Sequence, residues 1–552
     1  MNDCSSQQGP FKSRMMGVVV LLSLLPGMSA LEFTVYRMQQ FSLEGRSHGC
    51  RSVQVNAESR TPDAELLTRR CVLMRVTDFS MEKWTRILSQ SAAAILILVP
   101  AYLPAELTGP EQLFMEREME ILRNETLLPV YFTLEDPDLL EMYRESRAVS
   151  LSLTSSSALE VMIGMVMGSG FQMTTSEVQS KPIKSPAMVT LEGQLSGHEG
   201  TAEPPTVVVV AHYDAFGAAP LLAHGADSNG SGVSVLLEMI RLFHFLYNSP
   251  QSRGRYNILF SLTGGGKFNY QGSKRWIEEH LDHSETSILH ENVAFILCLD
   301  TLANGDSLHL HVSRPPAEGT AQWKFMKELQ SVVLSPPFLG VNFSVVHKKI
   351  NLGENILAWE HEQFSLRRLP AFTVSHLDSH KNGLKNTILD TRSRVDVKKL
   401  RRNAEMLCEA LARFLYKDTM KKTPGNLRIF QGDLGVDEGR LSAILDWLTL
   451  QPRAAQLITK SHPVLSTMEH LFRRHLKDVR RHVFKPDERN PEFIFYDQMK
   501  LTMTSHRVKP AVFDLFMALV IAAYLGVIHQ AIQNFGPAYR KFIQLITKQK
   551  KK

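Results

Sequence analysis

The segment Leu262–Ser273, LTGGGKFNYQGS, has a composition that could support chemistry. It follows an apolar run and precedes a helix-like stretch, an arrangement in which a glycine-rich turn often holds a phosphate or carries an active site. A P-loop requires Gly, four residues, and then Gly-Lys-Ser/Thr. Here Phe268 follows Lys267, and Ser261 stands where the first glycine is required. The dinucleotide pattern G-x-G-x-x-G also fits poorly, because position 269 is Asn. These residues favour a tight turn over a phosphate site.

Three other side chains with acid–base or metal-binding chemistry follow strand-like runs. His212 and Asp214 follow PTVVVV, and Asp300 follows VAFILCL. Such apolar runs are typical of strands buried on both faces of a mixed sheet. Their alternation with long amphipathic helices predicts a doubly wound α/β fold, in which chemistry lies at the carboxyl ends of the strands. We therefore expect His212, Asp214, the GGGK turn and Asp300 to meet at one rim of the sheet.

The order of these motifs resembles the co-catalytic zinc aminopeptidase superfamily. AHYDAFG, GADSNGSG, TGGGKFNYQGS, LCLDT and NTILDT follow one another as in that family. The family pattern has a His in H-x-D, a bridging Asp in D-x-x-S-G, a Glu-Glu pair, an Asp ending a strand, and a His four residues before Asp-Thr. Two neighbouring metal ions need a shared carboxylate and outer His, Asp or Glu ligands, and a Glu beside the bound water acts as the general base.

This sequence keeps only part of the pattern. In chain order, the metal-site positions hold His212, Asp214, Ser228 at the bridging position, Gly266 and Lys267 at the glutamate pair, Asp300, and Asn386 at the final histidine. The nearby His376 and His380 leave the last alignment open. The resemblance therefore implies a vestigial site without catalytic residues, metal or cofactor.

The departures have physical consequences. Without a bridging carboxylate, two metal charges would repel each other unscreened, and Gly266 cannot act as a base. Lys267 places an ammonium group where a cation should bind, which opposes metal binding. We hypothesise that Lys267 replaces the lost metal charge by pairing with Asp300 or Asp214.

The elements that must position these residues divide the chain into sections. Residues 31–170 alternate strand-like and helix-like stretches and predict a small α/β unit. Residues 171–420 predict a peptidase-like α/β domain with a doubly wound mixed sheet. Residues 421–506 predict a helical, charged region near a membrane. At 552 residues, the chain is long enough for two or more domains with sizeable cores.

Charge and cysteine content exclude some functions. The net charge of +6 is accounted for by six basic residues in the last stretch of the chain, so no direct nucleic-acid binding is predicted. None of the five cysteines forms a CxxC pair, so a cysteine-rich metal site is not expected. Cys298 and Cys408 fit core positions. Cys50 and Cys71 could pair in a lumenal domain, but their positions in the sequence do not settle this.

Two apolar segments predict a membrane topology. Residues 1–30 have the basic, apolar and small-residue regions of a cleaved signal peptide. Residues 511–532 form a transmembrane helix of roughly 33 Å in our prediction, although a buried helix has a similar pattern. The basic tail, residues 533–552, would then face the cytosol and the body would be lumenal. The ending KQKKK is similar to a lysine-based ER retrieval signal or a simple stop-transfer flank. Asp514 could contact an intramembrane partner or lie at the interface.

Three N-glycosylation sequons would be usable in the lumen. They begin at Asn124, Asn229 and Asn342. Of the three, we expect Asn229 to be the main glycosylated residue. It lies beside the loop of the former metal site, where a glycan would obstruct substrate.

Longer stretches, including EFTVYRMQQ, RRCVLMR, DWLTLQPRAAQL and RVKPAVFDL, are similar to the nicalins, inactive relatives of the zinc aminopeptidases. Nicastrin has a comparable altered site but is longer. The resemblance implies an ER membrane glycoprotein, single-pass type I, that associates with Nodal modulator and a small multi-pass membrane protein. It implies a scaffold role at the ribosome-associated translocon for multi-pass membrane proteins, and a link to Nodal signalling. The alternatives are a zinc aminopeptidase with unusual ligands and a lumenal peptide-binding receptor.

Overall fold

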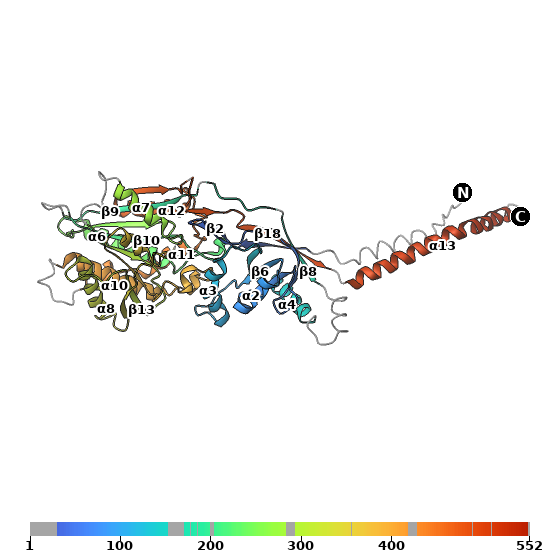
Figure 1. The fold of residues 1–552 in the computed structure, drawn as a ribbon, viewed down its shortest axis with the longest axis horizontal. Coiled ribbons are helices and arrows are strands. Elements are labelled where there is room, and N and C mark those ends of the chain that lie inside the picture. Colours follow the sequence, from blue (N-terminus) through green and yellow to red (C-terminus); the bar gives the residue numbers. More distant parts are fainter. Residues whose placement is uncertain are drawn as a thin grey trace, which may run out of the picture.

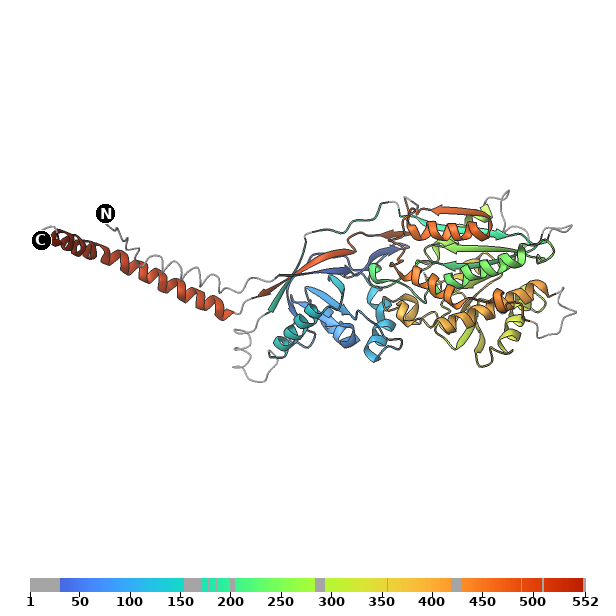
Figure 2. The ribbon, with the colours of Figure 1, turned by 180° about the vertical axis from the view of Figure 1, so that it is seen from behind.

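The molecule consists of an elongated body and one long helix that projects from it (Figure 1). The structure is a computed structural model that describes residues 30–152, 170–176, 178–184, 186–198, 204–282, 293–354, 356–417, 428–487, 489–508 and 511–549. Apart from its last residue, the predicted signal peptide lies outside these ranges. Seen from behind, a large α/β unit occupies one end of the body and a smaller barrel unit lies between it and the helix (Figure 2).

The large unit is built on an eight-stranded mixed sheet. Its strands, in spatial order, are β14 (Asn342–His347), β13 (Ser307–Val312), β15 (Ala371–Ser375), β12 (Val293–Leu299), β10 (Thr206–His212), β11 (Asn257–Thr263), β9 (Met188–Leu195) and β16 (Lys477–Phe484). The central strand β10 pairs in parallel with β11 and β12, and β12 pairs in parallel with β15. The predicted doubly wound mixed sheet is confirmed.

Helices cover both faces of this sheet, because successive side chains of a buried strand point to opposite sides. Val207 and Val209 of β10 belong to the core on one face, and Val208 and Val210 to the core on the other. The first core includes α6 (Gly230–Tyr247), α8 (Ala321–Val333), α10 (Val397–Tyr416), α11 (Glu438–Thr449) and α12 (Pro463–His475). The second includes α7 (Gln271–Asp282) and α9 (Glu360–Leu366).

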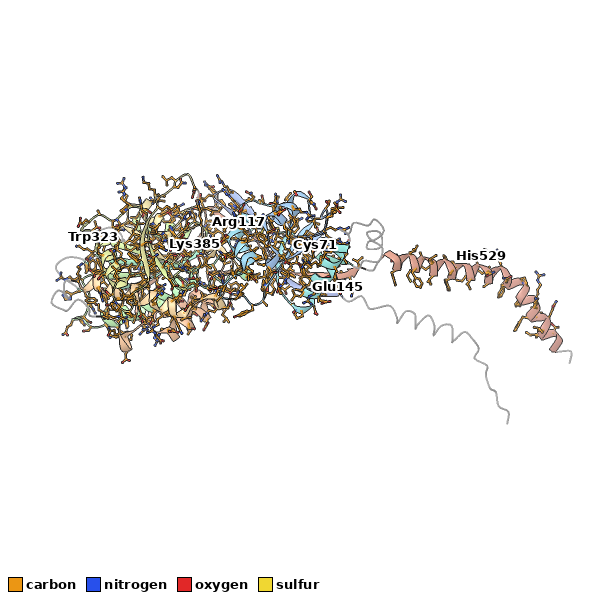
Figure 3. All side chains as sticks on the ribbon, turned by 90° about the horizontal axis from the view of Figure 1, so that it is seen from below. Cys71, Arg117, Glu145, Trp323, Lys385 and His529 are labelled. Atoms are coloured by element: carbon orange, nitrogen blue, oxygen red, sulfur yellow. The ribbon has the colours of Figure 1, made fainter. Side chains whose placement is uncertain are left out.

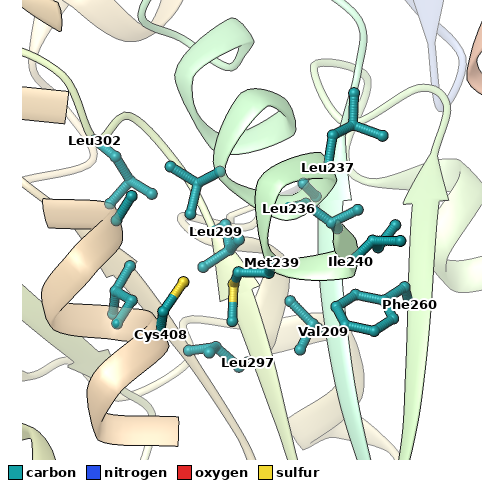
Figure 4. Close-up of a cluster of buried hydrophobic side chains, with 14 of the residues drawn as sticks. Val209, Leu236, Leu237, Met239, Ile240, Phe260, Leu297, Leu299, Leu302 and Cys408 are labelled. Carbon is teal, nitrogen blue, oxygen red and sulfur yellow. The ribbon is translucent and has the colours of Figure 1, made fainter. Parts of the chain in front are cut away.

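Figure 4 shows part of the first core, where α6 and α10 lie beside each other and both pack against the strands. Leu236, Met239 and Ile240 of α6 pack over strand residues, and Cys408 of α10 closes the layer. Each such buried side chain contributes about 1.5–3 kcal/mol of transfer free energy. This packing fixes the strands whose ends form the rim.

The smaller unit is a closed barrel. Its strands, in order, are β1 (Ala30–Arg37), β18 (Lys500–Val508), β8 (Gly170–Thr175), β4 (Asn56–Arg60), β5 (Cys71–Arg75), β6 (Ala94–Val99) and β7 (Val130–Leu134). Its helices are α2 (Met81–Ser89), α3 (Gly109–Leu122) and α4 (Pro137–Ser152). The predicted α/β unit is present, but it extends past residue 170 to include β8, and it is closed by a strand from far along the chain.

The expected helical region 421–506 is only partly helical. Helices α11 and α12 are present, but the run KDVRRHV, predicted as helix, forms strand β16 after α12 ends. Strand β16 joins the large sheet at its edge, where its charged side chains can reach water. Strand β17 (Phe493–Phe495) then pairs with the hairpin of β2 (Gln40–Leu43) and β3 (Arg46–Gly49), and β18 enters the barrel. Short 3-10 helices complete the described elements: η1 (Val76–Asp78), η2 (Pro220–Leu222), η3 (Gly383–Asn386), η4 (Arg392–Arg394) and η6 (Gly432–Leu434).

The projecting helix, α13 (Ala511–Gln549), is the one helix among the described residues that is long and apolar enough to cross a membrane. Its most apolar window has a mean hydropathy of 2.0 and is not buried against the rest of the chain. The helix does not end at residue 532 but continues through most of the predicted tail, past Pro537. The side chain of Asp514 is exposed on its first turn.

Cys50, Cys71, Cys298 and Cys408 are all buried as free thiols. The possible pair of Cys50 and Cys71 is therefore not formed. Cys71 begins barrel strand β5, and Cys50 directly follows β3; burial raises the pKa of both thiols, and that of Cys71 to about 12.

Candidate functional site

The predicted rim exists, because neighbouring parallel strands end at the same edge of the sheet. His212 is the last residue of β10, the GGGK turn follows β11, and Asp300 follows β12. His212, Asp214 and Asp300 are fully buried, and Lys267 is partly buried. The packing of β10 between β11 and β12 thus brings together the side chains that the sequence singled out.

The GGGK turn binds Asp214 through its backbone. The amide of Gly266 donates to Oδ1 of Asp214 at 2.8 Å, and that of Lys267 to Oδ2 at 3.0 Å. A Cβ atom at position 266 would lie 2.2 Å from Cγ of His212. The His212 ring therefore occupies the space that any side chain at position 266 would need, and the missing glutamate cannot be restored without moving it.

Asp300 is paired with a lysine that the sequence reasoning missed. Nζ of Lys385, on η3, lies 3.0 Å from Oδ2 of Asp300, and both side chains are buried. The same ammonium group lies 3.9 Å from the centroid of the Trp359 ring. Burial alone would raise the pKa of Asp300, but the charges of Lys385, His212 and Lys267 outweigh it and hold the pKa below its ordinary range. Lys385, the residue directly before Asn386, therefore supplies the positive charge beside Asp300.

Lys267 does not form the predicted ion pair with Asp300 or Asp214. Its Nζ donates to Oγ of Ser228 at 2.6 Å and to the carbonyl oxygen of Lys385 at 2.7 Å. Burial lowers the pKa of Lys267 to about 8, against the opposing effect of Asp300. Lys267 therefore fixes the Ser228 and Lys385 loops, and Lys385 is the direct partner of Asp300.

Ser228, at the bridging position, lies within a buried carboxylate cluster. Its amide donates to Oδ2 of Asp390 at 2.7 Å. The neighbouring Asp227 accepts from Nε2 of His376 at 2.9 Å and from the amide of Ala303 at 2.9 Å. Burial and the nearby Asp227 raise the pKa of Asp390 to about 6. Burial lowers the pKa of His376, but Asp227 outweighs it and raises that pKa overall.

Asn386 lines a cavity of about 730 Å³ between the two units. The cavity walls come from the β2–β3 hairpin, from α3, and from the loops before and at η3. They include Leu43, His48, Met119, Arg123, Ile356, His380 and Asn386. Of the two histidines that left the alignment open, His376 reaches the carboxylate cluster and His380 lines the cavity.

Glu360, at the start of α9, is a second residue that motif spacing did not reveal. Its carboxylate accepts from Oγ1 of Thr263 at 2.8 Å and from Oγ of Ser273 at 2.6 Å, and it lies 3.2 Å from Nδ1 of His212. The run AWEHEQF gave no spacing that would link it to His212. The contact arises because α9 packs against β12, β15 and α7, which places its first residue beside the ends of β10 and β11.

Asn229, where a glycan is expected, is not accessible to solvent in the folded chain. The side chain is fully buried. Its Nδ2 donates to the carbonyl oxygens of Leu299 at 2.8 Å and His212 at 3.1 Å, and its Oδ1 accepts from the amide of Thr301 at 3.2 Å. The nitrogen that would carry a sugar instead joins the ends of β10 and β12. Asn124 and Asn342 are exposed.

The residues at the rim do not fit a pair of zinc ions. A bridging site needs a carboxylate at position 228, where a serine hydroxyl bonded to an ammonium group is found. The buried carboxylate of Asp300 is already neutralised at 3.0 Å by Lys385. Two fixed positive charges within the cluster would repel a bound cation, so these residues do not support metal-assisted hydrolysis.

Comparison with known proteins agrees with the fold. The model of Peptidase family M28 matches residues 193–410. The crystal structure of the gamma-secretase component Nicastrin superposes with a TM-score of 0.59 at 11% identity, covering 86% of this chain and 99% of that chain, a likeness of fold alone. Fold and rim together define an M28-peptidase-like protein.

Proteins that match nearly the whole length of the chain identify its family within this class. BOS complex subunit NCLN of Homo sapiens is 52% identical over 535 residues, which cover 96% of this chain and 95% of the human protein. Nicalin of Caenorhabditis elegans is 27% identical over 517 residues, covering 90% and 89%. The chain belongs to the nicalin family.

Proposed function

We propose that this chain is a non-catalytic subunit of a BOS complex in the endoplasmic reticulum membrane, and that it acts as a scaffold. The observation that carries the proposal is the buried Lys385–Asp300 pair, which puts an ammonium group where a peptidase of this fold needs a metal ion. The proteins to which the chain is about half identical over nearly their whole length are named BOS complex subunits. If the rim cannot react, the fold is retained for its surfaces.

The loss of catalysis has its own test. The full chain, purified in mild detergent, should not release amino acids from aminoacyl chromogenic substrates, with or without added Zn²⁺. The matched control is the variant His212→Ala, which removes the remaining histidine of the motif. Turnover in the wild type that disappears in His212→Ala would support the alternative, a zinc aminopeptidase with unusual ligands, and overturn the proposal.

The membrane arrangement proposed is single-pass type I. The apolar side chains of α13 are exposed, and the helix carries basic residues only near its C-terminal end. By the positive-inside rule this end faces the cytosol and the body lies in the lumen. Protease added to sealed microsomes should remove only an epitope placed after Lys552. Digestion of the whole body would reverse the orientation.

The proposed partners are a Nodal modulator-like protein and a small multi-pass membrane protein. Together they would act at the ribosome-associated translocon in multi-pass membrane protein biogenesis, with a link to Nodal signalling. Mild-detergent purification of the tagged full chain, followed by mass spectrometry, should recover both partners in constant ratio. Recovery of neither, from cells that express both, would contradict the proposal.

A second candidate function is favoured by the cavity between the units. Its walls combine apolar side chains such as Leu43, Met119 and Ile356 with the charges of Arg123 and Glu354, as a peptide-binding cleft would. A lumenal peptide receptor predicts saturable binding of unfolded peptides by fluorescence anisotropy, without turnover. Binding should weaken in Met119→Asp, which places a charge in the cavity wall, and remain in Arg117→Gln, which changes an exposed residue of α3 outside the cavity lining. Equal binding by both variants would exclude this site.

A further inference from the structure

A second cluster of metal-ligating side chains lies away from the rim, where α7 covers the edge of the large sheet. It consists of Glu192 of β9, His280 of α7 and His482 of β16. Glu192 is 1% exposed and His280 4%, and the His482 side chain is 11% exposed. Among the described residues, this is the one group in which three His, Cys, Asp or Glu ligand atoms lie within 4.8 Å of one another.

The sequence places these side chains together through two regular elements. In the antiparallel pair of β9 and β16, Arg480 is opposite Glu192 and His482 is opposite Thr190. Glu192 and His482 are therefore diagonal neighbours on the same face of the sheet. On α7, Trp276 and His280 are four residues apart and share the face that packs on these strands.

The contacts converge on the carboxylate. Oε2 of Glu192 lies 2.9 Å from Nε2 of His280, and Oε1 lies 3.1 Å from Nε2 of His482. The second pair is close but not aligned as a hydrogen bond, and both of its atoms are buried without a hydrogen-bond partner. Ligand atoms around a tetrahedral zinc ion are about 3.4 Å apart, given bonds of about 2.0–2.1 Å. Both contacts are near that spacing.

Surrounding groups hold the ligands in place. Nδ1 of His482 lies 3.0 Å from Oε2 of Glu279, which leaves Nε2 facing the cluster. Nε1 of Trp276 donates to Oε2 of Glu192 at 2.7 Å. A carboxylate on the second ring nitrogen is the usual support of a metal-bound histidine, because it fixes the tautomer and strengthens the ligand.

We propose that Glu192, His280 and His482 bind one divalent transition-metal ion, of which zinc best fits two imidazoles and a carboxylate. The ion ties β16 to β9 and α7, and so anchors the returning C-terminal segment to the sheet. This site is separate from the rim and does not depend on the proposed function. The competing arrangement is a metal-free cluster in which a protonated His482 pairs with Glu192 and Glu279.

The test uses the full chain in mild detergent, with a tag that contains no histidine, stripped of metal by a chelator. Titration with Co²⁺ should give one equivalent per chain with the visible absorption of four-coordinate cobalt, and Zn²⁺ should displace it. His482→Ala should weaken binding by more than about 100-fold. Glu279→Gln, which alters only the supporting carboxylate, should weaken it by about 10- to 100-fold.

Two controls make the outcome decisive. His470→Gln changes an exposed histidine of α12 and should bind as the wild type does. His212→Gln removes the rim histidine and should also leave the titration unchanged. If no Co²⁺ binds to the wild type, or if binding is lost in His212→Gln but kept in His482→Ala and Glu279→Gln, the proposal is wrong. Gel filtration of each metal-free variant shows that it has folded.

Discussion

At the residue scale, the rim of this chain holds buried ammonium groups at the positions where a zinc peptidase of this fold would bind metal. A buried carboxylate without a counter-charge costs several kcal/mol, so the loss of a metal ion would leave Asp300 strongly destabilising. Lys385 supplies the counter-charge from η3 and stacks its ammonium group on Trp359, which adds a cation–π contribution. Lys267 instead fixes two loops by hydrogen bonds to a hydroxyl and a carbonyl oxygen.

The variant Lys385→Met should therefore destabilise the folded chain strongly. It leaves the buried, charged Asp300 without its direct ion-pair partner, a loss that typically costs about 3–5 kcal/mol. Lys267→Met should cost less, because no carboxylate loses its direct ion-pair partner. Thermal unfolding of both variants beside Lys381→Met, an exposed lysine on the same loop, measures the difference. Equal melting temperatures for Lys385→Met and Lys381→Met would show that the pair adds no stability.

Glycan occupancy should follow exposure rather than proximity to the former metal loop. Asn124 and Asn342 are exposed, whereas Asn229 is buried and bonded to three backbone groups. Asn124→Gln and Asn342→Gln should each increase gel mobility by one glycan when the chain is made in the ER. Asn229→Gln should leave the mobility unchanged. A glycan mapped to Asn229 by mass spectrometry would contradict this fold of the rim.

At the element scale, α3 of the barrel unit positions the loop that carries Lys385. The carboxylate of Glu118, on α3, accepts from the amides of Ala218 at 2.5 Å and Ile388 at 3.1 Å, and from Oγ1 of Thr387 at 2.5 Å. A Cβ at position 383 of η3 would lie 2.3 Å from a backbone oxygen of α3, so only glycine permits this close approach. The two units are thus joined at the rim itself.

The Glu118 contact predicts a pH dependence of stability. Burial raises the pKa of Glu118 from 4.5 to about 7 in the folded chain. Between about pH 4.5 and about pH 7 the folded state holds a proton that the unfolded state releases, so stability falls as pH rises through this range, by about 3 kcal/mol in total. Above pH 7 the contribution stays constant.

The variant Glu118→Gln tests whether Glu118 makes stability fall as pH rises through this range. Glutamine can still accept from the two amides, but it does not titrate. Asp390 and His376, whose pKa values are also raised, likewise make the free energy of unfolding fall as pH rises. The measurement is therefore the difference in free energy of unfolding between wild type and Glu118→Gln, obtained by urea unfolding between about pH 4.5 and about pH 7. That difference should shrink as pH falls. A difference that is the same at every pH would mean that Glu118 is not the titrating group.

At the scale of the whole molecule, the chain returns to its first described strand before helix α13 begins. Strand β18 pairs with β1 on one side and with β8 on the other, and thereby closes the barrel. Helix α13 begins shortly after β18 ends, so the barrel is the part of the body nearest the projecting helix (Figure 1). Figure 3 places Lys385 within the body and His529 on α13, so the rim lies far from the helix.

A chain that ends at Val508 should therefore fold without its membrane helix, whereas one that ends at Met499 should not. Removal of β18 leaves β1 and β8 with unpaired backbone groups at open sheet edges, which promotes aggregation. Secretion from cells, gel filtration and limited proteolysis compare the two forms, both keeping residues 1–30. A monodisperse, protease-resistant chain ending at Met499 would show that the barrel does not need β18.

Much of the fold was predictable because its signals are local. The apolar runs of β10, β11, β12, β13 and β15 read as buried strands, and the amphipathic periods of α6 and α10 read as helices. The run KDVRRHV gave no such signal, because an edge strand pairs on one side and keeps its charges in water. Its assignment as a strand depends on β9, which is nearly three hundred residues away in the sequence.

The sequence by itself determined the chemistry that is missing: a serine, a glycine and a lysine stand where two metal ions would need carboxylates. It also predicted a doubly wound mixed sheet with these residues at one rim, because the apolar runs alternate with amphipathic helices. Only the tertiary structure decided which cation neutralises Asp300, that Asn229 is buried, and that Glu192, His280 and His482 meet. Spacing along the chain fixes which face of its own strand or helix a side chain occupies, but not which distant element packs against that face.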